Sequence, residues 1–281
     1  MPMQPLIDGD ILVYEVAFSG QFKDEETDEV RPHPFEYVAE ILDDKIRQIC
    51  DAVWATEEPI IYLTGKTNFR FDIAKTKPYK GNRYKDKPFH YKNLRAYMKH
   101  KYNTVEVEGI EADDAMCIEQ TKRIGSLDTI ICSRDKDLRI CEGMHFGWEI
   151  GNSPQFGPKR VSYLGELQFE YKEEVDAKTG EPKEVLKKVR GEGLKFFYAQ
   201  LIMGDPVDNI PGLPRGGPFT VKAALEPCET ELEMFEVVLG LYEKRYGEEA
   251  RERLLEQARL LWMVRETDEE GNPVMWEFPD G

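Results

Sequence analysis

The sequence predicts an α/β fold in which helices cover both faces of a mainly parallel central sheet, followed by a second lobe made of helices. Two patterns predict it. In the first half of the chain, short apolar runs alternate with stretches of helical periodicity, which is typical of parallel strands joined by helical crossovers. From about residue 193 onward helical periodicity dominates, which indicates a separate helical layer.

Four apolar runs predict the strands of the sheet, at 6–7, 60–63, 104–107 and 129–132. Helices are predicted at 35–54 and 111–124, where apolar residues recur at three- and four-residue spacing. Turn residues between two apolar stretches predict a surface hairpin at 166–190. Later helices are predicted at 219–225, 230–244 and 248–263, and 264–281 is expected to be irregular or a short strand. We therefore divide the chain into an α/β lobe (1–165), a β-hairpin (166–190) and a helical lobe (191–281).

Composition narrows the class of protein. The chain has 281 residues, of which 41% are apolar, and no stretch approaches the roughly 18 apolar residues that a membrane span needs. The first apolar run lacks the basic flank and cleavage site of a signal peptide, so we expect a cytoplasmic protein with no membrane partner. None of the five cysteines has C-x-x-C spacing, and Cys117 and Cys132 are expected to be buried free thiols.

Positive charge is concentrated in one segment of an acidic chain. The net charge is −16, yet residues 66–101 hold twelve Lys or Arg and only two acids, Asp72 and Asp86. Seven aromatic residues lie among these cations. Cations beside aromatic rings suit single-stranded nucleic acid, whose phosphates and bases they can contact. A solvated basic helix face is the other interpretation, and the segment alone leaves both open.

Acidic residues follow three of the four predicted strands. They are Asp8 and Asp10 after the first, Glu111, Asp113 and Asp114 after the third, and Asp135 and Asp137 after the fourth. Parallel strands bring their carboxyl ends to one edge of the sheet, so these side chains should converge. Two carboxylates about 4 Å apart repel by roughly 4 kcal/mol at an effective dielectric of 20, unless a cation lies between them. Oxygen ligands favour Mg²⁺ or Mn²⁺, and two such ions catalyse phosphoryl displacement.

Five motifs occur in order along residues 8–212. They are Leu-Ile-Asp8-Gly, Tyr79-Lys80-Gly81-Asn82-Arg83, Glu111-Ala-Asp113-Asp114, Ser133-Arg-Asp135-Lys-Asp137 and Gly204-Asp205-Pro-Val-Asp208-Asn209-Ile-Pro-Gly212. Together they resemble the 5′-nuclease superfamily, which includes flap endonucleases, the 5′-nuclease domain of bacterial DNA polymerase I and phage 5′ exonucleases. The small size, with no polymerase attached, is most similar to the phage enzymes.

The resemblance implies a PIN-like nuclease lobe with a basic arch region at 66–101, and a helix–three-turn–helix DNA-binding element at 205–225. It implies that Asp8, Glu111, Asp113, Asp114, Asp135, Asp137, Asp205 and Asp208 bind two Mg²⁺ or Mn²⁺ ions. Lys80 and Arg83 match the basic pair below the arch, and with Asp8 and Asp135 we expect them to be catalytic. The expected DNA contacts are Tyr79, Lys80, Arg83, Tyr84, Lys85, Asn209, Gly212, Arg215, Gly217 and Lys222. A K⁺ ion held by backbone carbonyls of the second element is also implied.

The sequence departs from the family pattern in two places. Leu63 or Thr64 stands where the family has a carboxylate at the end of the second strand, so Asp10 or Asp72 is a candidate replacement ligand. Asp10 has a competing interpretation as the N-cap of a helix that begins near Ile11. In the second lobe Phe219 stands where a Lys is expected. Arg215 or Lys222 could replace that phosphate contact, and Pro218 suits the first turn of the helix that follows.

These patterns predict a divalent-metal-dependent 5′→3′ exonuclease or flap endonuclease. The expected substrate is DNA with 5′ ends, flaps or nicks, with RNA–DNA hybrids as further substrates, in phage-type replication or repair. We expect a monomer, located in the host cytoplasm if a phage encodes it. Two alternatives stay open from the sequence: a ribonuclease of the same fold, and a structure-specific DNA-binding protein whose metal site is impaired at Leu63.

Overall fold

A six-stranded sheet forms the centre of the computed structural model, which describes residues 3–82, 86–124, 129–175 and 180–279. The strands, in spatial order, are β5 (Thr104–Gly109), β4 (Ile60–Asn68), β1 (Gln4–Asp8), β6 (Thr129–Cys132), β7 (Gly143–Gly147) and β8 (Phe156–Val161). The first five strands are parallel and β8 pairs antiparallel to β7. The four predicted strands are confirmed, and β7 and β8 are additions that the sequence did not predict.

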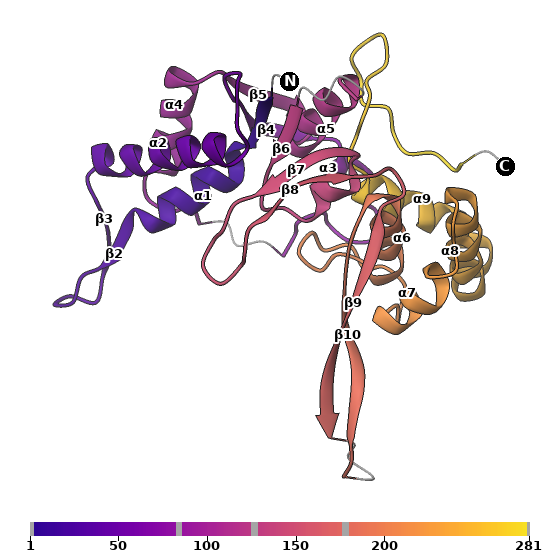
Figure 1. Ribbon diagram of the computed structural model, residues 1–281. Helices are drawn as coiled ribbons and strands as arrows, with labels where there is room; N and C mark the ends of the chain where they lie inside the picture. Colours follow the sequence, from indigo (N-terminus) through magenta and orange to yellow (C-terminus); the bar gives the residue numbers. More distant parts are fainter. Residues whose placement is uncertain (1–2, 83–85, 125–128, 176–179, 280–281) are drawn as a thin grey trace.

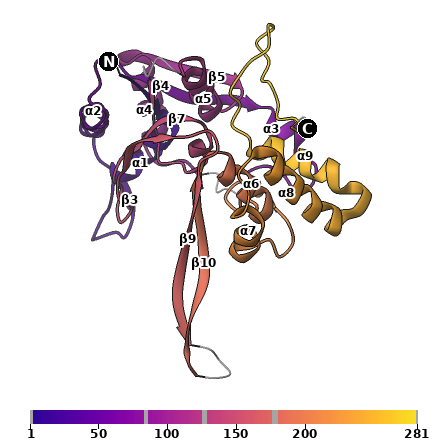
Figure 2. The ribbon, with the colours of Figure 1, turned by 45° about the vertical axis from the view of Figure 1, so that its right-hand side comes forward.

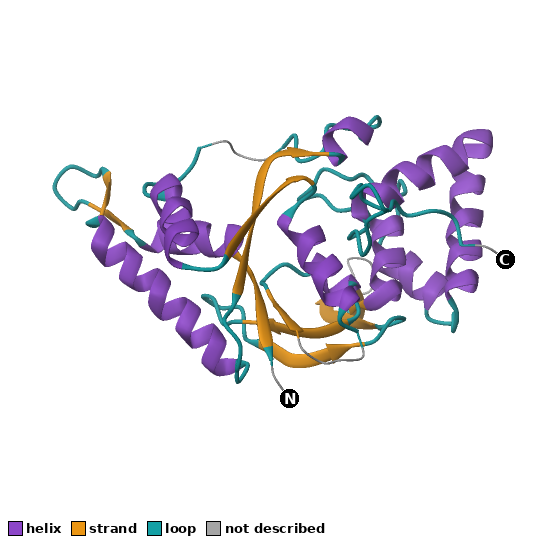
Figure 3. Cartoon of the chain, turned by 90° about the horizontal axis from the view of Figure 1, so that it is seen from above, coloured by secondary structure: helices purple, strands orange, loops and turns teal. Residues whose placement is uncertain are grey.

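Alternating side chains give the sheet two buried faces. Ile7, Ile61 and Leu63 point to one face, where they pack with α1 (Gly9–Ser19), α2 (Phe35–Ala52) and α4 (Tyr91–Lys101). Leu6 and Ile131 point to the other face, which α5 (Ala112–Lys122) and α6 (Gly193–Met203) cover. Figure 3 shows helices on both sides of the strands. The predicted fold class, a mainly parallel sheet between helical layers, is confirmed.

The first helix begins directly after the first strand. Asp8 ends β1 and is the N-cap of α1, because its Oδ1 accepts a hydrogen bond from the backbone N–H of Ile11 at 3.0 Å. Gly9 permits the close turn, since a Cβ there would lie 2.7 Å from the carbonyl oxygen of Tyr62. The suggestion that Asp10 caps a helix starting near Ile11 was therefore wrong: the helix starts at Gly9 and Asp8 is its cap.

The remaining helices pack beside the sheet and share its core. They are α7 (Pro218–Leu225), α8 (Glu231–Tyr246) and α9 (Ala250–Leu261), with a short α3 (Arg70–Ile73) after β4. Leu6 from the sheet and Phe197, Tyr242 and Leu254 from the helices belong to one continuous apolar cluster. The segment after α9 has one isolated bridge, between Thr267 and Pro273.

A long antiparallel hairpin, β9 (Glu166–Val175) with β10 (Pro182–Glu192), projects from the body of the molecule (Figures 1 and 2). A small hairpin, β2 (Gln21–Lys23) with β3 (Val30–Pro32), follows α1. Cys117 and Cys132 are buried free thiols, as expected. In the part of the chain that the structure describes, no helix is both long and apolar enough to span a membrane.

Candidate active site

The carboxyl ends of the strands open into a pocket of about 480 Å³. Its charged lining consists of six acidic side chains and two lysines, and Thr64 lies beside them: Asp8, Asp10, Glu15, Glu111, Asp113, Asp135, Lys80 and Lys87. Asp8 ends β1, Asp135 follows β6, and Asp113 lies in the first turn of α5. The convergence that parallel topology predicts is therefore present for these residues.

Three of these carboxylates lie close to one another: Asp8 is buried, and Asp113 and Asp135 are half-buried. Asp8 is only 2% exposed, and burial together with the charge of Asp10 raises its pKa to about 7. Burial and the charges of Asp8 and Asp135 raise the pKa of Asp113 well above its usual value, and no described residue donates a hydrogen bond to its side chain or pairs with it. Burial also raises the pKa of Asp135. This donor set has more negative charge than the chain itself compensates, which suits a divalent cation.

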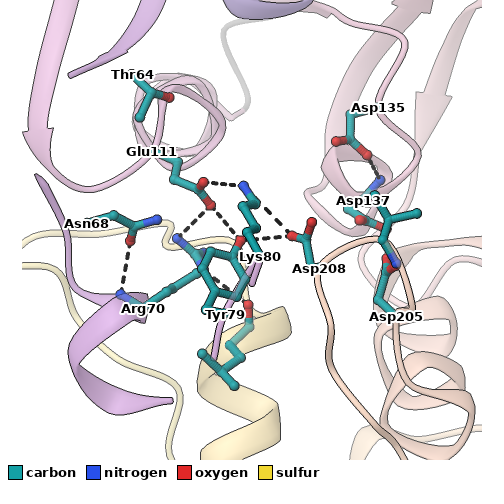
Figure 4. Close-up of polar contacts among 12 residues, drawn as sticks. Thr64, Asn68, Arg70, Tyr79, Lys80, Glu111, Asp135, Asp137, Asp205 and Asp208 are labelled. Carbon is teal, nitrogen blue, oxygen red and sulfur yellow. Dashed lines mark hydrogen bonds and ion pairs between the residues drawn. The ribbon is translucent and has the colours of Figure 1, made fainter. Parts of the chain in front are cut away.

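Glu111 differs from these residues because cations surround it (Figure 4). Lys80 donates to its Oε1, and Arg70 Nη1 lies 3.4 Å from its Oε2. Burial opposes ionisation, but the charges of Lys80 and Arg70 hold the pKa of Glu111 below its usual value. The hydroxyl oxygen of Tyr79 lies 2.8 Å from Glu111 Oε2 and 2.8 Å from Asp208 Oδ2. Its ring is 5% exposed, so it orients two carboxylates and has no open face for a base.

A second acidic group contains Asp137 and Asp205. Lys136 Nζ lies 2.8 Å from a carboxylate oxygen of each, and Gln200 donates to Asp137 at 2.6 Å. Burial and the charge of Asp135 raise the pKa of Asp137 to about 8. The sequence did not identify Lys136 as part of the site, since a lysine between two motif acids has no distinguishing spacing. In this structure it supplies the positive charge between these carboxylates.

Asp114 is engaged inside the protein. Its two oxygens accept from Arg70 at 2.6 and 2.8 Å, and they also accept from the backbone N–H groups of Glu111 and Val264. Both side chains are fully buried. Arg70 further donates to the carbonyl oxygens of Leu260 and Trp262 at the end of α9. Asp114, expected as a metal ligand, therefore joins α3, α5 and α9 and has its oxygens occupied.

The structure shows which side chains lie where the family has a further carboxylate. Leu63 is fully buried in the core, and Thr64 lines the acidic pocket with its Oγ1 accepting from the N–H of Ala112 at 2.9 Å. Asp10 reaches the same place, because its Oδ2 accepts from the N–H of Thr64 at 2.8 Å and its Oδ1 pairs with Arg95 at 2.6 Å. Asp72 is exposed and does not line this pocket.

Two of the five motifs dock against each other. The N–H of Lys80 donates to the carbonyl of Asp208 at 3.0 Å, Asn82 Nδ2 donates to Pro206 at 2.7 Å, and Asn209 Nδ2 donates to Pro78 at 2.9 Å. This docking brings Lys80 to the acidic pocket. Arg83, Tyr84 and Lys85, expected to contact DNA, lie outside the described residues.

Much of the basic segment is paired with the acidic body. Lys75 pairs with Glu252, Lys99 with Glu106, and Lys101 with Asp43. Lys66, Lys77 and Lys92 lie on the surface. Several cations of 66–101 therefore have acidic partners elsewhere in the chain, and nucleic-acid binding by this segment stays a prediction.

The loop between α6 and α7 is tightly folded around two glycines with positive φ. A Cβ on Gly212 would lie 2.2 Å from the backbone nitrogen of Gly204. Gly217 caps α7 and Pro218 occupies its first turn, as expected. Arg215 and Phe219 are exposed, while Lys222 donates to the hydroxyl of Tyr171 on the hairpin at 2.8 Å.

Three solved structures resemble this chain over most of its length. A flap endonuclease variant of bacteriophage T5, described as a pseudo-enzyme–product complex with DNA and metal ions, aligns with a TM-score of 0.56 and 18% identity, covering 92% of this chain and 88% of that one. A T5 protein co-crystallised with metal ions aligns at 0.52 and 18%, covering 92% and 86%. A T5 5′-exonuclease with bound zinc aligns at 0.51 and 19%, with the same coverage. No protein-family model and no curated protein sequence matches the chain.

Proposed function

We propose that this chain, which has the 5′-nuclease superfamily fold, is a divalent-metal-dependent nuclease that hydrolyses DNA phosphodiesters near 5′ ends, as a 5′→3′ exonuclease or flap endonuclease. One observation carries the proposal: Asp8, Asp113 and Asp135 share a pocket in which their charge is not compensated, with Lys80 on its wall. The structural neighbours, some of which contain metal ions or DNA, support it.

The metal ligands that we propose fall into two groups. The first group consists of Asp8, Asp113 and Asp135, with Glu111 and Asp10 beside them. The second group consists of Asp137, Asp205 and Asp208. In the part of the chain that the structure describes, no three Asp, Glu, His or Cys side chains are arranged so that they could hold one metal ion, so bound water would have to complete the coordination. Partial hydration is what Mg²⁺ retains in proteins, so this open arrangement fits Mg²⁺ or Mn²⁺. Bound ions would supply hydroxide at neutral pH and stabilise charge on the scissile phosphate.

The chain's own residues orient this chemistry. Ser133 donates to Asp8 Oδ2 at 2.7 Å while the N–H of Ile11 holds Oδ1, so the Asp8 carboxylate has a fixed direction. Tyr79 holds Glu111 beside Asp208. Lys80 faces the pocket as a cation and is the residue that we assign to the phosphate undergoing cleavage, with Arg83 as its expected companion. Asp114 acts through Arg70 as a positioning residue for the first turn of α5.

DNA binding is assigned to the α6–α7 element. No side chain caps the start of α7 at Gly217, and the free N–H groups of a helix N-terminus favour phosphate. Asn209, Gly212, Arg215 and Lys222 belong to the same element or the loop before it. The same proposal includes four further points. They are a K⁺ ion in this loop, cleavage of RNA–DNA hybrids, action as a monomer and a role in phage replication. They rest on the motif resemblance described above.

A magnesium titration with 5′-flapped DNA tests the function. We expect cleavage with Mg²⁺ or Mn²⁺, none in chelator, and products that carry a 5′ phosphate. Single-stranded RNA in parallel separates the alternatives, because a ribonuclease would prefer it over flapped DNA. Tight binding of flapped DNA with no cleavage at any Mg²⁺ concentration would instead indicate a structure-specific binding protein and would refute the nuclease.

A further inference from the structure

A second polar pocket, of about 290 Å³, lies beside the acidic one. Three arginines line it: Arg134 from the loop after β6, Arg139 from the short helix that follows, and Arg190 from β10. Residues 152–156 and the base of the hairpin complete its walls. Arg134 stands inside the fourth motif, between Ser133 and Asp135, whereas Arg139 and Arg190 lie outside the five motifs.

Two of the three guanidinium groups have unused hydrogen-bonding capacity. Arg139 stacks on the ring of Phe156, with its guanidinium carbon 3.8 Å from the ring centroid. Its guanidinium forms no hydrogen bond or ion pair with any described residue. Arg134 Nη1 donates to the carbonyl of Pro154 at 3.0 Å, but its Nε is buried without a partner among the described residues. Burial and the charge of Arg134 hold the pKa of Arg139 below its usual value.

Among the described residues, the acids of this pocket form no ion pair with Arg134 or Arg139, although Glu192 and Asp135 attract the charge of Arg139. Glu166 and Glu192 also line the pocket, but Lys159 pairs with them at 3.1 and 2.7 Å. Arg190 pairs with Glu170 on the neighbouring strand. Two planar donor groups therefore line one cavity without an ion-pair partner among the described residues. Guanidinium forks match phosphate oxygens in geometry and charge, so a phosphate group is the ligand class that fits.

The two pockets are neighbours along the chain and in space. Arg134 lines the arginine pocket, and the next residue, Asp135, lines the acidic pocket. The loop after β7 also lines both pockets. Ile150 lines the acidic pocket, and residues 152–156 line the arginine pocket. Because these two segments line both pockets, we expect a strand that enters the acidic pocket to pass near Arg134 and Arg139.

We propose that Arg134, Arg139 and Arg190 form a binding site for a DNA backbone phosphate other than the one that is cleaved. The proposal rests on the proposed nuclease function and extends it with a contact that fixes which phosphate reaches the carboxylates. Arg134 and Arg139 are the principal donors, and Arg190 adds charge from the hairpin.

The test measures binding of full-length protein to 5′-flapped DNA in chelator, where no cleavage occurs, at several salt concentrations. Arg139→Gln removes one charge but keeps a side chain of similar length. We expect weaker binding and a log–log salt slope that is smaller by about 0.9 for a duplex phosphate or about 0.7 for a single-stranded one. Arg160→Gln is the matched control, because Arg160 lies on β8, pairs with Glu142 and does not line the pocket. Its slope should equal that of the wild type.

DNA with single neutral methylphosphonate linkages locates the contact. Wild-type protein should lose affinity at one linkage, and Arg139→Gln should show no further loss there. Arg139→Lys should keep most of the salt slope, and melting temperatures establish that each variant folds. The proposal would be overturned if Arg139→Gln and wild type had equal salt slopes. It would also be overturned if Arg139→Gln changed only the binding of inorganic phosphate. Neither result would contradict the proposed nuclease function. Failure of the wild type to bind DNA at all would overturn both.

Discussion

Asp113 and Asp114 are neighbours in the sequence, yet replacing each by Asn should change stability in opposite directions. Asp114 is fully buried and its carboxylate accepts from Arg70, which is fully buried too. Asp114→Asn keeps the shape but leaves the Arg70 guanidinium without a counter-charge. Asp113 has no hydrogen-bond or ion-pair partner among the described residues and lies among like charges, so Asp113→Asn should relieve repulsion in the metal-free protein.

The magnitude for Asp114 follows from the desolvation of its partner. Removing one member of a buried ion pair typically lowers the free energy of unfolding by about 3–5 kcal/mol. Arg70 keeps its hydrogen bonds to the carbonyls of Leu260 and Trp262, which places the expected loss near the lower end of that range. At about 2–4 °C per kcal/mol, the melting temperature should fall by roughly 6–12 °C.

Thermal and urea unfolding in chelator measure the stability change of each variant. Wild type, Asp113→Asn and Asp114→Asn are compared under the same conditions. We expect Asp113→Asn to be at least as stable as wild type and inactive, and Asp114→Asn to be less stable but to retain metal-dependent cleavage at low temperature. Wild-type stability for Asp114→Asn would refute the account of the Arg70 pair. Destabilisation by Asp113→Asn would refute the account of uncompensated charge.

Three further predictions concern the acidic pocket. Asp10→Asn should raise the Mg²⁺ concentration needed for half-maximal cleavage, because Asp10 is the carboxylate that reaches Thr64; an unchanged Mg²⁺ dependence would exclude it as a ligand. Lys80→Ala should lower turnover by about 10²–10³-fold, as loss of a transition-state donor does, whereas Lys77→Ala on the surface should not. In metal-free protein the free energy of unfolding should fall between pH 5 and pH 8. The native state holds protons on Asp8 and Asp137, with pKa about 7 and about 8, that the unfolded chain releases near 3.8. Mg²⁺ should therefore raise the melting temperature more at pH 8 than at pH 5, and an equal shift at both would contradict the site.

The central sheet could be predicted because the signal for each strand lies in a few consecutive residues. Runs such as 60–63 and 129–132 are apolar because both faces of a parallel strand are buried, and that continuity is visible in the sequence. The rule that parallel strands end at one edge then brought Asp8 and Asp135 together. By contrast, α1 was recognised only in part, since it follows β1 without a turn and its residues Leu12, Val13, Val16 and Ala17 are buried on several sides.

Side-chain pairing across the fold could not be predicted. Whether Asp114 faces a cation or a metal depends on Arg70, and the position of Arg70 depends on how α9 packs. The same holds for Lys136 between Asp137 and Asp205, and for Arg95 beside Asp10. Motif spacing identifies which acids are present. Tertiary packing decides which of them already have a cationic partner.

The most direct test of the nuclease assignment is single-turnover cleavage of 5′-flapped DNA by the purified protein, with wild type compared to Asp135→Asn across a magnesium titration. We predict cleavage near the 5′ end that rises with Mg²⁺, stops in chelator and is lost in Asp135→Asn although that variant still binds the DNA. Cleavage that persists in chelator, or that Asp135→Asn retains at the wild-type rate, would contradict the assignment of the acidic pocket as a metal-dependent active site.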